Sequence, residues 1–405
     1  MRLRSFTLQS FANFVQPVTF GPLDEVNVVY GPNNAGKSNL LRALELYFRL
    51  LGSGEAVTKN QQQMLDESDP ALWQLVASSI NRSDPKPIIF TANWSISDST
   101  LERYGLFPEL PCNSITTVLQ LTPGSRALEL RVQKWQMGDQ QVADMDRAKD
   151  LTKVGFAQQV RRLLSDACPF QFEKPVLPCG RFAQSFEPFP QTLRDALFDA
   201  RQSRLPAQRR RWAVFARAAG ELAAELGEGN WDTVFDRVTG HADVVWMQGD
   251  TSLNLEDMGA GVQRMAGLLA ELALAREIYA CFEEPEWRLS PALQTRFVRQ
   301  ARQIVRTAIG PRQVFITTHS PILARGGVPF AVDLVDGAPV IEQRAWLDAG
   351  DSAGDAAVNG AGPDLDQLVG LVEELAELDP DEILEEPAKA PKGRPAAPWA
   401  GAPRR

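Results

Sequence analysis

A short segment near the start of the chain, Gly31-Pro32-Asn33-Asn34-Ala35-Gly36-Lys37-Ser38, constrains the fold most strongly. It satisfies the phosphate-binding loop pattern of Gly, four residues and then Gly-Lys-Ser. Residues 26–30 before it predict a short buried strand, and residues 39–46 after it predict a helix. In that setting the backbone N–H groups of the loop point inward, and the helix N-terminus adds partial positive charge. The sequence therefore predicts a nucleoside triphosphate site.

Composition places the chain among soluble globular proteins. Of its 405 residues, 44% are hydrophobic and 23% are charged, which are ordinary values. There is no uninterrupted apolar run of about 18 residues, so we expect no membrane span. The four cysteines lack metal-ligand spacing, which favours reduced thiols in the cytoplasm over disulfides.

The net charge of −9 is concentrated near the C-terminus. Residues 351–386 contain twelve acidic side chains and no basic one, and residues 387–405 contain five basic and no acidic ones. The composition after residue 387 predicts disorder. We therefore expect a head over residues 1–345, followed by an acidic helix and a disordered tail over 346–405. The nearly neutral head leaves nucleic acid open as a ligand.

Alternating polar and apolar residues predict several strands in the first half. Residues 2–14 and 18–20 read as a hairpin, and residues 87–95, 114–121 and 127–135 read as three further strands. Prolines scattered between positions 85 and 206 exclude a long coiled coil, because proline inside a helix costs about 3 kcal/mol. We divide the head into a P-loop lobe (1–50), a β/helical insert (51–240) and a third part (241–345).

An arginine cluster precedes a predicted helix that ends near Leu226. Its members are Arg201, Arg204, Arg209, Arg210 and Arg211. One interpretation is a site for the phosphates of DNA or RNA. The other is a solvated helix start whose arginines lie along the surface. The charge cluster alone does not separate the two.

Two buried strands end in polar residues suited to phosphate chemistry. Residues 278–286 end in Glu283 and Glu284, and a P-loop needs such a strand beside it. Its first acid would hold the Mg²⁺ shell and its second would polarise the attacking water. Residues 313–318 lead to His319, which would contact the γ-phosphate from a strand beside the P-loop strand. The alternative is a histidine of the core or surface.

The order of these motifs resembles a known family. The stretches 258–264, 283–286 and 318–321 follow the P-loop in the order found in ABC-type ATPase heads. Among such heads, the sequence resembles those of the OLD (overcoming lysogenization defect) family and related RecF/SMC-like proteins. Phe11-Ala12-Asn13-Phe14 also matches their N-terminal pattern. The resemblance implies an α/β fold: an ABC-type P-loop NTPase head with an antiparallel β-subdomain, a helical lobe and a disordered C-terminal tail.

The resemblance also implies roles for individual residues, with ATP and Mg²⁺ held between two protomers. The phosphates would be cradled by Gly31, Asn33, Asn34, Ala35, Gly36, Lys37, Ser38 and Asn39. Glu283 and Ser38 would support Mg²⁺, Glu284 would activate water, and Lys37 and the switch histidine His319 would assist. The signature loop of the second protomer would contribute Gly259, Gly261 and Gln263, followed by a helix over 265–276.

Two departures from the family pattern affect the function expected. Gly259 stands where the signature serine is usual, so hydrolysis is expected to be slow. The residues after Phe330 predict a hairpin and the acidic tail, so we expect no Toprim nuclease domain of the kind that OLD nucleases carry. A Q-loop glutamine has only Gln61, Gln62 and Gln63 as candidates.

Three hypotheses for function remain open. The first is a sensor and scaffold ATPase that forms ATP-sandwich dimers or larger homo-oligomers and controls a separate effector, a nuclease or toxin, in bacterial anti-phage defence. PARIS- and Septu-like systems are the model that the resemblance implies. The second is a RecF-like DNA-binding ATPase of repair or recombination that binds DNA through residues 204–211. The third is a structural protein that uses ATP without hydrolysis to join two copies.

Overall fold

The computed structural model describes residues 2–52, 62–64, 76–77, 80, 86–96, 114–122, 127–137, 140–144, 189–223, 227–275, 279–307 and 310–344. All of them belong to one compact unit, residues 1–347. The acidic helix and the tail expected over 346–405 lie outside the described residues. The division of the head into three parts stays a prediction.

The strands are β1 Arg2–Gln9, β2 Val18–Phe20, β3 Val26–Tyr30, β4 Gln62–Met64, β5 Ile88–Ser95, β6 Ser114–Thr122, β7 Ala127–Met137, β8 Gln140–Asp144, β9 Asn230–Asp236, β10 His241–Gln248, β11 Thr251–Asn254, β12 Tyr279–Glu283, β13 Gln313–Thr318, β14 Val328–Val335 and β15 Ala338–Gln343. The helices are α1 Lys37–Gly52, α5 Gln191–Gln202, α6 Pro206–Gly220, α7 Ala260–Leu274, α8 Pro291–Arg306 and α9 Pro321–Arg325, with a 3₁₀ turn, η3, at Leu255–Asp257.

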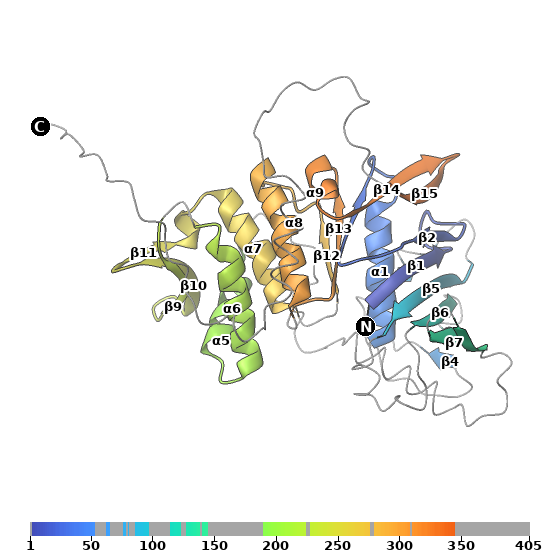
Figure 1. The fold of residues 1–405 in the computed structure, drawn as a ribbon, viewed down its shortest axis with the longest axis horizontal. Coiled ribbons are helices and arrows are strands. Elements are labelled where there is room, and N and C mark those ends of the chain that lie inside the picture. The colour runs from blue at the N-terminus through green and yellow to red at the C-terminus, as the bar shows by residue number, and fades with distance from the viewer. Residues whose placement is uncertain are drawn as a thin grey trace, which may run out of the picture. The chain divides into compact units, whose positions relative to one another are not determined.

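A mainly parallel sheet forms the centre of the unit (Figure 1). Its strand order is β12-β13-β3-β14-β15, in which only the β14–β15 pair is antiparallel. The sequence predicted the strand of His319 beside the P-loop strand, and this is confirmed, because β13 pairs with β3. The strand of Glu283, expected beside the P-loop, is separated from β3 by β13. The hairpin predicted after Phe330 is confirmed as β14 and β15.

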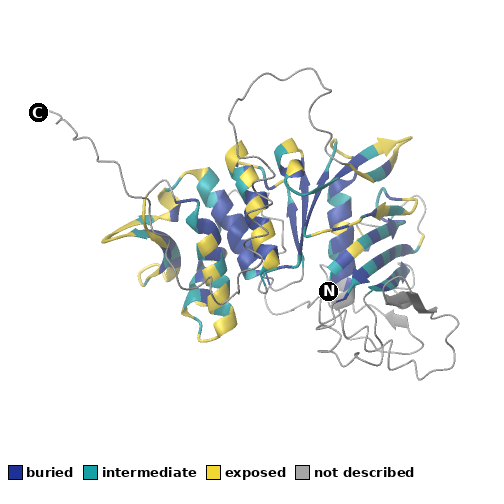
Figure 2. Cartoon of the chain, viewed as in Figure 1, coloured by how far each residue is buried: buried dark blue, intermediate teal, exposed yellow. Residues whose placement is uncertain are grey.

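Both faces of this sheet are buried, which explains why its strands read as continuous apolar runs. In β3, Val26 and Val28 face the helices on one side, and Val29 faces α1 on the other. β13 alternates in the same way, with Phe315 on the α1 side. Figure 2 shows the central strands in the colour of buried residues. Asn27 is fully buried in β3, and its side chain is satisfied by hydrogen bonds with the backbone of Asp24.

The β-subdomain predicted from the alternation is confirmed as an antiparallel sheet. Its order is β2-β1-β5-β6-β7-β4, with β8 paired to β7. Helix α1 packs between this sheet and the central one (Figure 1). The Tyr47 hydroxyl lies 3.1 Å from the Thr117 hydroxyl and accepts a hydrogen bond from the indole of Trp94 at 3.1 Å. The side chain of Gln313 adds a second link, because it pairs with both the N–H and the carbonyl of Leu3.

A helical lobe packs on the other face of the central sheet. The sequence predicted one helix after the arginine cluster, ending near Leu226. The structure has α6, which already contains Arg209, Arg210 and Arg211 and ends at Gly220, and a second helix, α5, before it. Helix α5 was missed although Leu193, Leu197 and Ala200 recur at helical spacing and are buried. The antiparallel sheet β11-β10-β9, which lies against α5, was also missed. None of the helices in the described ranges is long and apolar enough to cross a membrane.

Phe20 joins the two sheets and provides a test of this arrangement. Its buried ring lies 4.6 Å from that of Phe330 and 6.0 Å from that of Phe315. We expect Phe20→Ala to reduce the free energy of unfolding by about 3–5 kcal/mol, because a large buried ring leaves a cavity. Chemical denaturation measures this. Val335→Ala, at a residue that is 55% exposed, is the control and should change it by less than about 0.5 kcal/mol.

Candidate functional site

The carboxyl ends of β3, β13 and β12 meet at one edge of the central sheet. The P-loop follows β3, His319 follows β13, and Glu284 follows the last residue of β12, Glu283. Parallel strands with adjacent ends bring together residues that are far apart in the sequence, and this edge is where open α/β sheets bind ligands. The sequence-based grouping of these residues at one edge therefore agrees with the fold.

The geometry of the loop depends on two glycines. A Cβ on Gly31 would lie 2.2 Å from the carbonyl oxygen of Val332 in the neighbouring strand. Gly36 has φ +113°, and a Cβ there would lie 2.9 Å from the Asn13 amide. Asn34 adopts the left-handed region at φ 61°, which asparagine tolerates better than most residues. Ala35 is fully buried, so it offers a ligand only its backbone.

The turn between β1 and β2 packs against the P-loop and the first turn of α1. The Asn13 side-chain oxygen accepts a hydrogen bond from the amide of Asn39 at 2.9 Å. Two mutual backbone hydrogen bonds close the turn between Phe11 and Phe14, and both rings are fully buried. The sequence of this turn matched the family pattern, but it predicted no role for Asn13. Asn39 itself therefore faces the turn rather than open space.

Lys37 is the buried cation of the site. Its side chain is 6% exposed, and the ammonium donates hydrogen bonds of 2.9 Å to the carbonyls of Gly31 and Pro32. Burial lowers the pKa of Lys37, and the carboxylates of Glu284, Glu286 and Glu283 oppose that shift. The cation therefore lies in the field of all three glutamates at the end of β12.

Glu284 and His319 form a pair at the same edge. The His319 Nε2 lies 3.3 Å from the Glu284 Oε1, and these side chains are 39% and 53% exposed. Glu284 holds φ at 48°, and its backbone N–H donates to Thr317 at 2.8 Å. A non-glycine residue held at positive φ is uncommon and is typical of functional turns. The pair that sequence analysis selected is thus brought together, and it faces solvent.

Glu286 fixes the position of His319. Its Oε1 accepts hydrogen bonds from the Thr318 hydroxyl at 2.7 Å and from the backbone N–H of His319 at 2.8 Å. Gln294 holds the next residue by accepting a hydrogen bond from the Ser320 hydroxyl at 2.6 Å. The sequence predicted no role for Glu286. The only signal was a third acid two residues after the predicted pair.

The signature region differs from the expected loop. The sequence predicted a helix starting at Met265, whereas α7 starts at Ala260 with Gly259 as its N-cap. Gly261 and Gln263 are therefore helical, because the Gly259 carbonyl accepts the N–H groups of Val262 and Gln263. No atom lies within 4 Å of a Cβ placed on Gly259, so a side chain would fit there.

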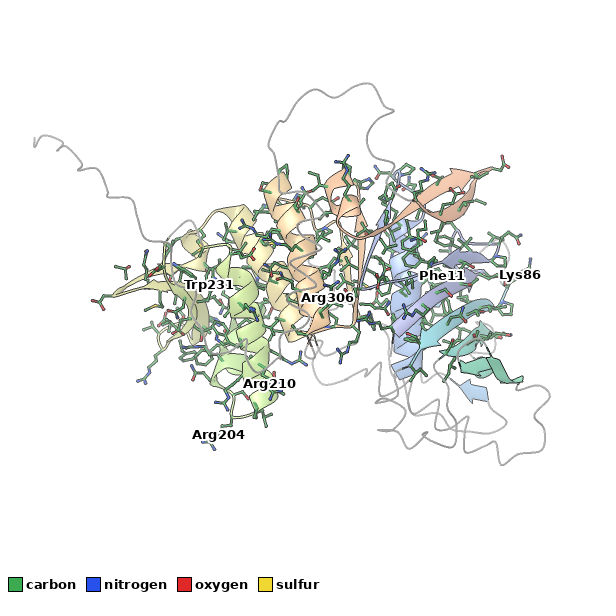
Figure 3. All side chains as sticks on the ribbon, viewed as in Figure 1. Phe11, Lys86, Arg204, Arg210, Trp231 and Arg306 are labelled. Carbon is green, nitrogen blue, oxygen red and sulfur yellow. The ribbon has the colours of Figure 1, made fainter. Side chains whose placement is uncertain are left out.

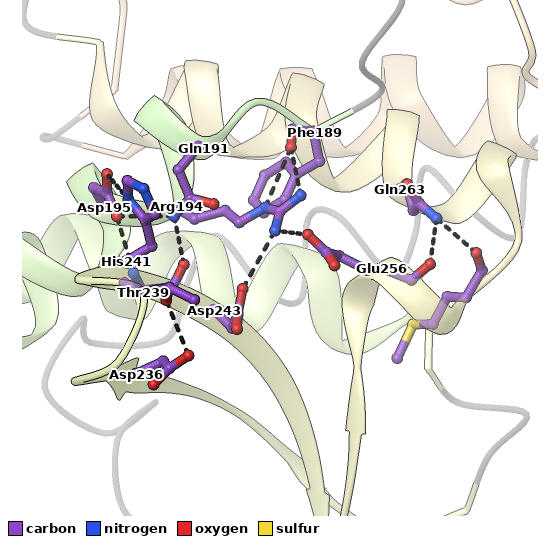
Figure 4. A network of polar contacts seen from close by, with 12 residues as sticks. Phe189, Gln191, Arg194, Asp195, Asp236, Thr239, His241, Asp243, Glu256 and Gln263 are labelled. Carbon is purple, nitrogen blue, oxygen red and sulfur yellow. Dashed lines mark hydrogen bonds and ion pairs between the residues drawn. The ribbon is translucent and has the colours of Figure 1, made fainter.

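A polar network anchors the approach to α7 (Figure 4). The buried Arg194 bridges Asp243 of β10 and Glu256 of η3. The Gln263 amide donates to the carbonyls of Glu256 and Met258 at 2.9 and 2.8 Å. Gln263 thus holds its own loop in place, and its donor group is engaged there. Among the Q-loop candidates, Gln62 and Gln63 lie on β4 of the antiparallel sheet, and Gln61 lies outside the described residues.

The arginine cluster divides into two kinds of residue. Arg201 forms an ion pair with Asp232, and Arg211 donates to the Leu274 carbonyl at 2.9 Å near the end of α7. Arg204, Arg209 and Arg210 are exposed around the start of α6, as the labels in Figure 3 indicate for two of them. Two of the five arginines therefore serve the packing of the lobe.

Comparisons with known proteins agree with this fold. The family described as "AAA domain, putative AbiEii toxin, Type IV TA system" matches residues 26–325. An SMC head bound to the C-winged helix domain of ScpA is similar at 13% identity and TM-score 0.50, over 85% of this chain and 99% of that chain. The SMC head domain from Thermotoga maritima matches at 15% identity and TM-score 0.45, over 85% and 100% of the two chains. No curated protein matches. The predicted ABC-type head fold is confirmed.

The role of Glu286 gives a test of the site geometry. We expect Glu286→Ala to lower the free energy of unfolding by about 1–3 kcal/mol, because the Thr318 and His319 donors lose their acceptor. Glu286→Gln keeps an acceptor oxygen and should retain most of that stability. Chemical denaturation of both variants measures the difference. Equal losses in the two variants would contradict the assignment.

Proposed function

The chain belongs to the AAA-domain family described as putative AbiEii toxin of type IV toxin–antitoxin systems, and we propose that it is an ATPase that closes around ATP as a sandwich of two copies. In this proposal the closed pair controls a separate effector, a nuclease or toxin, in anti-phage defence in the cytoplasm. The observation that carries the ATPase assignment is the meeting of the P-loop, Glu284 and His319 at one sheet edge.

The P-loop would bind the triphosphate through its backbone and Lys37. The Lys37 ammonium donates to two carbonyls of its own loop, and phosphate oxygens would replace these acceptors. Because the ammonium is buried, its interaction with an anionic oxygen is strengthened by the low local dielectric. The start of α1 adds the partial positive charge of a helix N-terminus.

The residues of the site also fit Mg²⁺. Ser38 and Glu283 are half-buried oxygen donors, and their side chains make no hydrogen bond within the described ranges. Mg²⁺ in phosphate sites is commonly held by one or two protein oxygens together with the phosphates. When bound, it would neutralise the charge that builds on the phosphate oxygens.

Glu284 and His319 would carry out the hydrolytic step. The Glu284 carboxylate would accept a proton from the attacking water, and His319 would hold that carboxylate and contact the γ-phosphate. Both side chains are partly exposed, whereas catalysis of this type requires an enclosed, dry site. A second copy placed over this edge would supply the cover.

The start of α7 is the surface that would meet the ATP of the second copy. Gly259 and Ala260 are exposed, and the first turn of α7 has neither an acidic residue nor a side-chain cap. Backbone N–H groups at such a terminus suit a phosphate. Because Gly259 offers no hydroxyl group, hydrolysis is expected to be slow.

Two substitutions separate binding from turnover. Lys37→Ala should abolish binding of a fluorescent ATP analogue, because the buried counter-charge is lost. Glu284→Gln should keep binding but stop hydrolysis, so that ATP accumulates in the closed pair and the native mass doubles. Normal turnover by Glu284→Gln would show that the catalytic assignment is wrong.

The effector is supported by the description of the family, which names a toxin–antitoxin system, a two-component arrangement. The ATP-trapped Glu284→Gln protein, purified from its host and analysed by mass spectrometry, should carry a nuclease or toxin in fixed stoichiometry. The Lys37→Ala protein is the matched control and should not carry it. Recovery of DNA with recombination proteins alone would contradict the effector and favour a RecF-like role.

One observation favours that second candidate, an ATPase that binds DNA. Arg204, Arg209 and Arg210 are exposed around the start of α6, and the helix contains no acidic residue. Arginines grouped in this way suit a phosphate backbone.

If the chain binds DNA, replacing all three arginines with Glu should abolish binding to duplex DNA. The logarithm of the wild-type association constant should fall linearly with the logarithm of the salt concentration, with a slope of about −0.9 per phosphate contacted. Fluorescence anisotropy measures both. Arg237→Glu, at an exposed arginine of the β9–β10 turn, is the control. If the wild type binds no DNA, or the triple variant binds as well as the wild type, this candidate fails.

A further inference from the structure

The turn after the catalytic glutamates is strained at both ends. Glu284 has φ 48° and Arg288 has φ 63°, although neither is a glycine. The N–H of Leu289, the residue after Arg288, donates to the carbonyl of Glu286 at 2.9 Å, which closes the turn. Residues held at positive φ concentrate where a side chain must be presented in one direction. In this turn the side chain presented at the second strained position is that of Arg288.

The guanidinium of Arg288 lies on the surface of the molecule. It is exposed and stacks over the ring of Trp287, with 4.1 Å between Cζ and the ring centroid. Trp287 is itself 40% exposed, which is unusual for a large aromatic side chain. The cation–π contact holds the guanidinium in one orientation without neutralising its charge.

The backbone of the same residue touches the start of the signature helix. A Cβ on Gly261 would lie 3.0 Å from the carbonyl oxygen of Arg288, so the turn and the first residues of α7 are in close contact. Burial lowers the pKa of Arg264 in α7, and the positive charge of Arg288 adds to that shift, which agrees with a position of Arg288 near α7. Arg288 therefore belongs to the surface formed by the start of α7.

We propose that Arg288 is a catalytic residue in trans, which contacts the γ-phosphate of the ATP bound to the P-loop of the second copy. The proposal rests on the ATP sandwich proposed above, in which the start of α7 covers the partner's nucleotide. Gly259 has no hydroxyl group there, and the guanidinium of Arg288, whose backbone carbonyl lies beside Gly261, would supply donors and a positive charge in its place. Charge developing on the γ-phosphate oxygens in the transition state would be stabilised by this cation.

The prediction for a single variant concerns turnover rather than binding. Arg288→Ala should lower kcat by about 10²–10³-fold, the usual effect of losing one transition-state donor. Its own P-loop is intact, so it should still bind a fluorescent ATP analogue, and its thermal midpoint should stay near that of the wild type. The kcat of Arg288→Lys should lie between that of Arg288→Ala and that of the wild type. The control Arg237→Ala, at an exposed arginine on the β9–β10 turn, should keep the wild-type rate.

Mixing two inactive proteins tests whether the residue acts across the interface. The Lys37→Ala chain cannot hold ATP but still presents Arg288, and the Arg288→Ala chain holds ATP without the partner's arginine. An equal mixture should regain up to about a quarter of the wild-type rate, since half of the pairs are mixed and each has one complete site. Each protein alone should remain inactive.

Three results would overturn the proposal, and each would show a different part of it to be wrong. If Arg288→Ala keeps the wild-type rate, only the role of Arg288 is wrong. If it is inactive and the mixture stays inactive, the residue acts within its own copy and the trans assignment is wrong. If the wild-type protein neither hydrolyses ATP nor pairs in its presence, the proposed function falls together with the role of Arg288.

Discussion

The charge balance around the buried Lys37 is the interaction on which the rest of the site depends. One ammonium group lies in the field of Glu283, Glu284 and Glu286, and it is otherwise held by two carbonyls of its own loop. Three carboxylates facing one cation would repel a bare triphosphate, so a polyphosphate ligand requires further positive charge. In the proposed closed pair this positive charge would come from three sources: Mg²⁺, the helix N-termini of α1 and α7, and an arginine of the second copy.

The order of the central strands produces this concentration of charge. Because β13 lies between β3 and β12, the turn that carries His319 is placed between the P-loop and the glutamates. Glu286 then ties the ends of β12 and β13 together through the Thr318 hydroxyl and the His319 N–H. Burial of both faces of the sheet fixes the strand positions, and Phe20 and Gln313 join the sheet to the β-subdomain. Packing far from the site therefore sets its geometry.

Sequence reasoning found the features with local signals and missed those set by distant contacts. The P-loop, Glu284 and His319 were identifiable because each follows a short apolar strand with a characteristic residue pattern. The place of β13 between β3 and β12 was not, since the full strand order depends on long-range pairing. The start of α7 was placed too late because Gly259 and Gly261 resemble a loop, whereas burial of Arg264, Met265 and the residues after them favours a helix. The β10–β11 hairpin had a usable signal in Gly249-Asp250 that was overlooked.

The dependence of ATP hydrolysis on protein concentration tests the central claim, a site completed by a second copy, most directly. Turnover per chain would be measured with Mg²⁺ and saturating ATP over a wide range of protein concentrations, with the mass of the protein followed in parallel. A composite site predicts that turnover per chain rises with concentration and levels off as the protein becomes paired. Turnover that is constant while the protein remains a monomer would show that one copy suffices and would contradict the account.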